Sequence, residues 1–464
     1  MDTMSSTKRL LCFAASLGVL ALVLAGPVSA QQESSSRTVT PPQAAADDAA
    51  KSGDPVAIDQ SPSNTSPTLP AATSGPLRMG TARLLDLRGA IRIGPFYVSS
   101  VDFAQALDEF RPSGGTTMKG FRNVATFVRT FMVYQHAFRR GRLALQYEPH
   151  LSVINGHSEL NYTDQELSLD LRYALSQRWG LDLADYFSYV RNRNRLGSFL
   201  DAESVTGRTF PTAFVDTRGP WLSNGFSAGF TYHLSARTQL SFGPSIGYSH
   251  EFPGLTSSRS ISSFSTGARA AISHTLSARK SIEGYYFYQR SIFSTDFPST
   301  TYHTMGAGYS QALGSTWTMS TSLGVSTASS HNGPRPWHVV GSLGLVKAFP
   351  KSQLSFHFAR GYGLSGFISN RYADRVDAAF EHRWTQRLST SVGLGYQREL
   401  GSAAGSYSGE YATGQVSYRL LANVSWFANY VYKLQAGGIA QAINGSRYFF
   451  STGLRWEPGR AAGR

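Results

Sequence analysis

Several Ser and His residues stand at spacings that could support nucleophilic catalysis. His150 lies two positions before Ser152, and His233 lies two positions before Ser235, so each pair would share one face of an extended strand. A serine hydrolase also needs a third group that orients the base. Because a Ser-rich chain with 11 His contains such pairs by chance, neither pair predicts an enzyme.

Residues 225–229 read Gly-Phe-Ser-Ala-Gly and match the Gly-x-Ser-x-Gly string of hydrolases. That string places a nucleophile only at a sharp turn between a strand and a helix. Here it lies within an alternating, strand-like segment. The sequence also contains no His-Glu-x-x-His motif, no spacing typical of metal ligands and no Gly-rich phosphate loop. We therefore expect no enzyme, no cofactor and no bound metal.

A second set of chemically active side chains is charged and recurs on the polar side of alternating segments. From residue 80 onward Lys and Arg outnumber Asp and Glu by about 15, which would favour anions if the excess lined a pore. The alternatives are a cross-strand salt-bridge network or basic turns that contact lipid phosphates. The candidate lumen-facing residues are Arg142, Glu148, Asp170, Arg172, Arg269, Glu283, Arg375, Asp377, Glu381, Arg383, Arg419 and Lys433.

Strands must position these side chains, because the chain alternates between apolar and polar residues with period two. In residues 143–153 the odd positions are mostly apolar and the even positions mostly polar, and later segments repeat the pattern. Each run has about ten residues, the length of a tilted transmembrane strand. Only 16% of residues are charged and 12% are aromatic, with 45 Gly. One unbroken pattern over such a length favours a membrane barrel over a soluble β-sandwich.

Short turns alternate with longer polar connections, which predicts hairpins with one tight end. The tight turns lie near residues 140, 177, 236, 278, 314, 350, 386 and 422. They join sixteen strands between about 123 and 434, a further strand covers 447–456, and residues 88–101 supply the strand that makes the number even. The expected fold is therefore all-β, a single transmembrane antiparallel up-and-down barrel of about 18 strands of the bacterial outer-membrane type, with sixteen as the fallback.

The N-terminus has the features of an export signal. Lys8 and Arg9 precede an apolar stretch over residues 10–25, and a small-residue cleavage site follows at 28–30. The only cysteine, Cys12, lies within this segment. We predict a signal peptide at 1–30, a disordered Pro/Ala/Ser-rich periplasmic leader at 31–84, the barrel at 85–457 and a short periplasmic tail at 458–464. The expected location is the bacterial outer membrane.

The chain resembles a family of outer-membrane β-barrel porins associated with exopolysaccharide gene clusters. Residues 90–97, Ala-Ile-Arg-Ile-Gly-Pro-Phe-Tyr, and the hairpin at 376–396 carry the resemblance. It implies passage of polysaccharide across the outer membrane or a scaffold role in its traffic. The last strand also resembles the aromatic signal that the barrel-insertion machinery reads, with Tyr448, Phe450, Leu454 and Trp456 on one face.

These observations favour a porin-like channel for passive passage of solutes or (exo)polysaccharide. The first alternative is a non-conducting structural barrel for envelope polysaccharide assembly, and an outer-membrane hydrolase is a weaker one. The expected partners are outer-membrane lipid and lipopolysaccharide, the insertion machinery, anionic polysaccharide and envelope export proteins. The pI near 9.8 does not indicate nucleic acid, because an exported barrel does not meet it.

Overall fold

The computed structural model describes residues 91–112, 121–155, 161–190, 220–252, 260–294, 299–330, 333–334, 337–362, 372–400, 407–437 and 445–458. The expected signal peptide at 1–30 and leader at 31–84 lie outside these residues, as does the chain beyond 458. Residues 192–223, one of the longer polar connections that the sequence predicts between tight turns, lie mostly outside them too.

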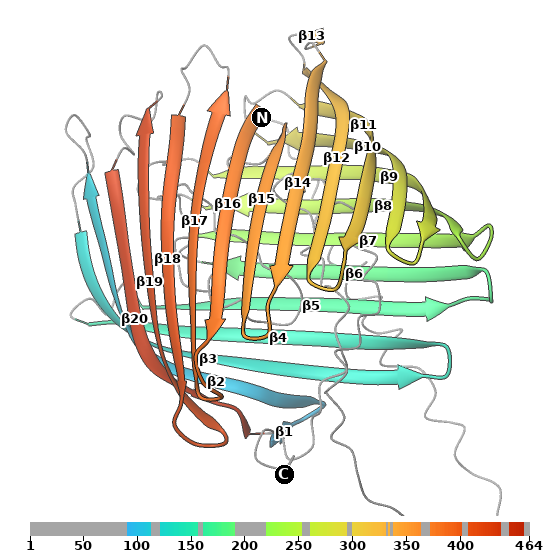
Figure 1. The fold of residues 1–464 in the computed structure, drawn as a ribbon. Helices are drawn as coiled ribbons and strands as arrows, with labels where there is room; N and C mark the ends of the chain where they lie inside the picture. Colours follow the sequence, from blue (N-terminus) through green and yellow to red (C-terminus); the bar gives the residue numbers. More distant parts are fainter. Residues whose placement is uncertain are drawn as a thin grey trace, which may run out of the picture. The chain divides into compact units, whose positions relative to one another are not determined.

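Eighteen long strands make one antiparallel sheet (Figure 1). They are β2 (Phe96–Pro112), β3 (Phe121–Phe138), β4 (Gly141–Ile154), β5 (Tyr162–Ala174), β6 (Trp179–Val190), β7 (Trp221–His233), β8 (Thr238–Glu251), β9 (Ile261–Ser277), β10 (Lys280–Phe293), β11 (Thr300–Leu313), β12 (Trp317–Ser330), β14 (His338–Ala348), β15 (Ser352–Tyr362), β16 (Tyr372–Arg383), β17 (Leu388–Leu400), β18 (Tyr407–Arg419), β19 (Val424–Gly437) and β20 (Gly445–Trp456). Two short strands, β1 (Ile91–Ile93) and β13 (Gly333–Pro334), pair with β2 and β12.

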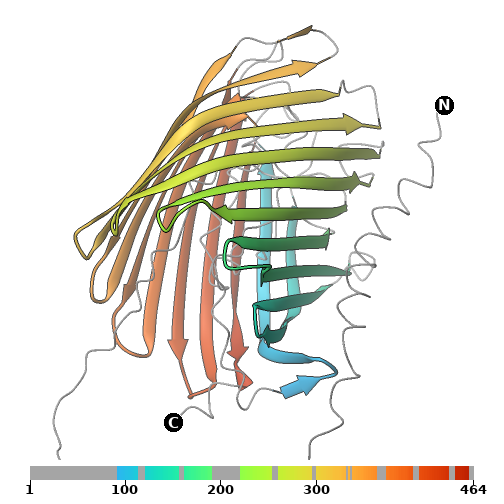
Figure 2. The ribbon, with the colours of Figure 1, turned by 90° about the vertical axis from the view of Figure 1, so that its right-hand side faces the viewer.

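The sheet closes on itself because β20 pairs with both β19 and β2. The closing ladder runs from Val101 opposite Trp456 to Pro112 opposite Gly445. The red strands β18–β20 and the blue strand β2 are therefore neighbours in Figure 1, and Figure 2 shows the wall from β5 to β12 that faces away from them. The prediction of one antiparallel up-and-down barrel with eighteen strands is confirmed.

The predicted first strand, residues 88–101, was wrong in its position. Gly94 adopts a φ of 60°, a left-handed conformation that suits glycine. With Pro95 it forms a turn that folds Ile91–Ile93 back onto Phe96–Val98. The barrel strand β2 starts after this turn and extends to residue 112. Its alternation is hard to recognise, because Ala104 and Phe110 lie on the polar side and Gln105 on the apolar side.

All eight predicted tight turns are present at one end of the barrel. Three of them share one local cause. Ser176 Oγ accepts hydrogen bonds from the backbone N–H groups of Arg178 and Trp179 at 3.2 and 3.1 Å. Ser235 and Thr385 cap their turns in the same way. A short hydroxyl side chain thus satisfies the backbone donors that a four-residue turn leaves open.

One face of the sheet carries large apolar side chains that are exposed. Leu323 is 67% exposed, Leu394 is 56% exposed, and similar residues recur at every second position of most strands. We call this the outer face, and the opposite one the inner face. The described residues include no helix that is long and apolar enough to cross a membrane.

Candidate functional site

The inner face carries all twelve charged residues that the sequence singled out. Strand alternation shows that they lie on the inner face, because each is an odd number of positions away from the exposed apolar residues of its own strand. On β16, for example, Phe380 is exposed on the outer face, and its neighbours Ala379 and Glu381 lie on the inner one. The same reasoning places Arg142, Glu148, Asp170, Arg172, Arg269, Glu283, Arg375, Asp377, Arg383, Arg419 and Lys433 on the inner face.

Carboxylates neutralise several of these cations directly. Arg269 donates through Nη2 to Glu283 Oε1 at 2.5 Å between β9 and β10. Glu148 is bound by Arg129, a residue that the sequence reasoning missed, and both side chains are buried. Arg172 lies 3.5 Å from Asp170 on its own strand and 3.6 Å from Asp182 on β6. The wall therefore pairs its charges across neighbouring strands.

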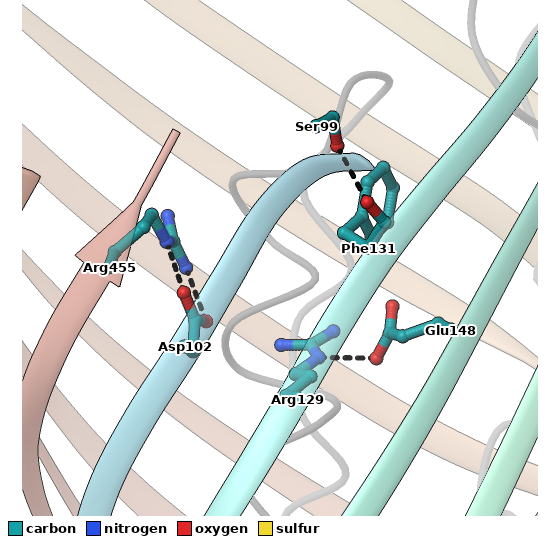
Figure 3. A network of polar contacts seen from close by, with 6 residues as sticks. All are labelled: Ser99, Asp102, Arg129, Phe131, Glu148 and Arg455. Atoms are coloured by element: carbon teal, nitrogen blue, oxygen red, sulfur yellow. Dashed lines mark hydrogen bonds and ion pairs between the residues drawn. The ribbon is translucent and has the colours of Figure 1, made fainter. Parts of the chain in front are cut away.

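The closing ladder between β2 and β20 holds two further ion pairs that the sequence reasoning missed. Arg455 donates to both oxygens of Asp102, at 2.8 and 3.1 Å (Figure 3). Arg447 binds Asp108 in the same two-pronged way, with Nε 2.8 Å from Oδ1. Such bidentate pairs are stronger and more directional than a single charged hydrogen bond. They were missed because the first strand was placed too early, which left Asp102 and Asp108 outside any predicted strand.

The Arg129–Glu148 pair lies one strand away from this seam. Figure 3 shows it between β3 and β4, beside the Asp102–Arg455 pair. Between the two clamps of the seam the inner face is mostly apolar, with Asn429 and Ser451 as buried polar residues. Its buried apolar residues form one cluster, which contains Ala104, Ala106, Phe127, Phe427, Val431 and Phe449. The seam is thus a packed wall with ionic clamps.

Asp377 is the centre of a second network, which spans four strands. It is 0% exposed and accepts hydrogen bonds from Arg375 Nε and from the Tyr411 hydroxyl, each at 2.7 Å. His357 Nδ1 lies 3.8 Å from Oδ2 of this carboxylate, the oxygen that also accepts from Arg375. The ring of Tyr411 crosses Gly395, where a Cβ atom would overlap the ring. Only glycine on β17 therefore lets β18 reach the carboxylate on β16.

Two of the remaining candidates lie opposite other cations. Lys433 faces Arg447 across the β19–β20 ladder, and Arg142 faces Arg172 across β4 and β5. Arg383 and Arg419 are the last residues of β16 and β18, at the tight-turn end. These positions show no single cluster of candidates. The twelve residues are instead spread around the wall.

Among the side chains that the structure describes, the inner face carries as many positive as negative ones. The cations are Arg129, Arg142, Arg172, Arg269, Arg375, Arg383, Arg419, Lys433, Arg447 and Arg455. The carboxylates are Asp102, Asp108, Glu148, Asp164, Glu166, Asp170, Asp182, Glu283, Asp377 and Glu381. Within the described residues, the excess of positive charge therefore lies in the tight turns and on the outer face.

The wall opposite the seam is lined by small hydroxyl side chains. Thr304 and Ser326 are hydrogen-bonded between β11 and β12 at 2.7 Å. Ser322 and Ser342 are paired at the same distance between β12 and β14. Small polar residues leave space and offer both donors and acceptors to water or to a hydroxylated solute.

The residues considered for hydrolysis have structural roles. Ser227 lies in the middle of β7, opposite Ser245, and so is not at a nucleophile elbow. Ser235 caps a tight turn. His150 stacks on Phe127 with 5.1 Å between ring centroids. No group of three or more His, Cys, Asp or Glu among the described residues could hold a metal ion.

The residues of the expected assembly signal lie on the outer face of β20. Phe450 and Leu454 are exposed there, and Tyr448 and Trp456 share their phase. Next to them, Trp426 on β19 donates through Nε1 to Thr452 Oγ1 at 2.9 Å. The role of this surface in assembly stays a prediction.

No protein-family model and no curated protein matches the chain. Among solved structures, it is similar to OpdQ of Pseudomonas aeruginosa, with 9% identity, a TM-score of 0.43, and coverage of 77% of this chain and 96% of that one. It is also similar to OccK2 (OpdF) of the same organism in complex with glucuronate, with 8% identity, a TM-score of 0.44, and coverage of 79% and 98%. A third similar structure is OccAB3 of Acinetobacter baumannii, with 9% identity, a TM-score of 0.41, and coverage of 78% of this chain and 100% of that one. Because these scores are low, the fold assignment depends on the strand pairing itself.

Proposed function

We propose that this chain is a channel of the bacterial outer membrane, through which solutes pass passively. The observation that carries the proposal is the closed ring of eighteen strands, with exposed apolar side chains outside and a polar, charge-balanced face inside. The apolar outer face suits contact with lipid, and the polar inner face suits contact with water. A closed barrel also leaves no strand edge unpaired, which a membrane-spanning sheet requires.

The dimensions of the barrel fit this proposal. Its strands have 11 to 18 residues, whereas about 9–11 tilted residues cross the hydrocarbon core. Barrels of 16–18 strands are wide enough to leave an aqueous channel. Strand length and strand number therefore favour a membrane-spanning pore.

The balanced inner wall supports passage of neutral or weakly charged solutes through its strand region. The hydroxyl of Ser342, which is half-buried on this wall, is of the type that suits hydroxyl-rich sugars, and this is the chemical basis for extending the proposal to polysaccharide. In that role the partners would be lipopolysaccharide, the insertion machinery and envelope export proteins.

Single-channel conductance of the refolded mature chain in a planar bilayer tests the proposal. We expect stable current steps, with a reversal potential under a salt gradient that indicates only weak charge selectivity at high salt. A protein that is shown to be folded and inserted, yet gives no steps, would refute the channel. The resistance of the folded barrel to unfolding in unheated detergent serves as the folding control.

The second candidate function is a non-conducting scaffold barrel. One observation favours it, because Asp377 and Gln397 on the inner face are both 0% exposed. Side chains that line an open aqueous lumen normally contact solvent. The same bilayer experiment separates the two functions, since a scaffold gives inserted protein without current.

A further inference from the structure

Eight residues occupy equivalent positions at the tight-turn end of the barrel. Each directly precedes a strand that leaves a tight turn, and its carbonyl oxygen accepts a hydrogen bond from the backbone N–H of the neighbouring strand, at 2.7 to 2.9 Å. They are Arg140, Arg178, Arg237, Arg279, Thr316, Lys351, Arg387 and Asn423. Six of the eight are basic and none is acidic. We call these six cations the mouth ring.

The side chains of the mouth ring have the phase of the inner face. Each hydrogen bond extends the strand ladder by one residue, so the alternation of faces continues by one step. The residue after each ring position belongs to the outer face, as exposed Trp179 after Arg178 illustrates. All six ring cations are exposed. They therefore surround the opening of the barrel instead of the lipid-facing perimeter.

The residues that donate hydrogen bonds to the ring positions add more positive than negative charge at the tight-turn end. Arg383 and Arg419 donate the backbone hydrogen bonds to Lys351 and Arg387, and Glu457 donates the bond to Asn423. Among the ion pairs between described residues, none uses a ring cation. This differs from the strand region of the inner face, where the described side chains include as many carboxylates as cations.

The spacing of the ring makes its charges act together. Where consecutive ring cations are two strands apart, they are about 10 Å apart along the ladder direction. The Debye length is about 8 Å at physiological ionic strength, so the potentials of two neighbouring ring cations overlap only in the space between them. A single small anion would meet one cation at a time, whereas an anion with several charges can meet two or more.

We propose that the mouth ring binds multivalent anions, with several carboxylate or phosphate groups, that enter the barrel from the tight-turn end. The inference rests on the proposed channel for its direction of entry. Lipid headgroups are the competing ligand, but the cations with outer phase suit them better. Lys347, for example, lies on the outer face with Nζ 4.6 Å from the Trp317 ring centroid.

The test uses short-chain inorganic polyphosphate as the probe and compares two triple variants of equal charge. The first, R178Q/R237Q/R387Q, removes three ring cations. The matched control, K280Q/R290Q/K347Q, removes three cations of the outer face. Polyphosphate is added to each side of a bilayer in turn, and the half-blocking concentration is measured at low and high salt.

We expect polyphosphate to block the parent at a lower concentration from one side of the bilayer than from the other. At low salt, the half-blocking concentration of the ring variant should be about tenfold higher than that of the parent. The control variant should stay within about twofold of the parent, and high salt should remove the difference. Equal block in the two variants would overturn the inference. So would a ring variant that changes only its insertion into vesicles of anionic phospholipid, which would identify the ligand as lipid.

Failure of the channel itself remains distinguishable from failure of the ring. If the folded barrel gives no current, binding of fluorescent polyphosphate to the barrel in detergent replaces the block assay. Binding that the ring variant weakens and the control does not would support the ring without a channel. Binding that is absent, or equal in both variants, would refute it.

Discussion

The seam of the barrel, where β2 pairs with β20, and the wall opposite to it hold their paired strands together with different side-chain contacts. At the seam, β2 and β20 are held by two bidentate Arg–Asp clamps around a buried apolar cluster. At β11, β12 and β14, Ser and Thr hydroxyls form the cross-strand contacts. The seam partners are 339 and 353 residues apart in sequence, whereas the hydroxyl wall joins consecutive strands.

Sequence separation explains this difference. A hairpin with a capped tight turn fixes its own register, because the turn aligns the two strands. No turn aligns β20 with β2, so their register must come from the side chains and the backbone ladder themselves. Charged bidentate pairs are directional and costly to misalign. We infer that the clamps specify the register of closure, and four experiments test this comparison.

The largest effect is expected from removal of Tyr448 to Trp456, which deletes most of β20. The truncation leaves β19 and β2 with unpaired edges, which a membrane-embedded sheet does not tolerate. We expect loss of membrane-assembled barrel, measured by fractionation and by heat-modifiable mobility in detergent gels. A serine replacement of Tyr448, Phe450, Leu454 and Trp456 separates the outer-face signal from the strand itself. Normal insertion of that variant would show that the aromatic face is not the assembly signal.

Asp108→Ala should weaken the seam strongly. It leaves Arg447, whose side chain is only 5% exposed, without its bidentate carboxylate. Breaking a buried pair in this way costs about 3–5 kcal/mol, and we expect a clear drop in the temperature at which the barrel unfolds in detergent. The double variant D108A/R447M should recover part of the loss. Equal stability of D108A and the parent would contradict the clamp.

Gly395→Ala should have an intermediate effect. The added methyl group overlaps the Tyr411 ring, so the ring must move and its hydrogen bond to Asp377 at 2.7 Å is lost. Overpacking of this kind costs about 1–3 kcal/mol. Gly414→Ala on the adjacent strand is the matched control, because nothing lies within 4 Å of its added Cβ. Denaturant unfolding should give a lower free energy of unfolding for Gly395→Ala than for Gly414→Ala. Equal free energies would show that the contact of Tyr411 with Asp377 does not stabilise the barrel.

Ser322→Ala should have the smallest effect. It removes one hydroxyl pair, with Ser342 at 2.7 Å, from a hairpin wall whose register other contacts already fix. A hydrogen bond of this type contributes about 0.5–1.5 kcal/mol. Unfolding of this variant beside D108A provides the most direct comparison of the two walls. A loss as large as that of D108A would mean that both walls depend equally on their side chains.

The sequence by itself determined the architecture of this protein. Period-two alternation, turns such as Ser176 to Trp179, and the even strand number all have local causes, because a strand face repeats every two residues and a capped turn needs only neighbouring atoms. For the same reason it put the twelve charged candidates in one phase. It misplaced the first strand, since the turn at Gly94 interrupts an apparently continuous pattern.

Only the tertiary structure decided which charges meet. The pairing of Asp102 with Arg455, the path of Tyr411 over Gly395 to Asp377, and the ring of turn cations depend on register and closure. The balance of charge on the inner face likewise depends on the strand and the face that each residue occupies. Net charge counts residues along a chain, whereas the potential at a wall depends on which side of the closed sheet each residue occupies.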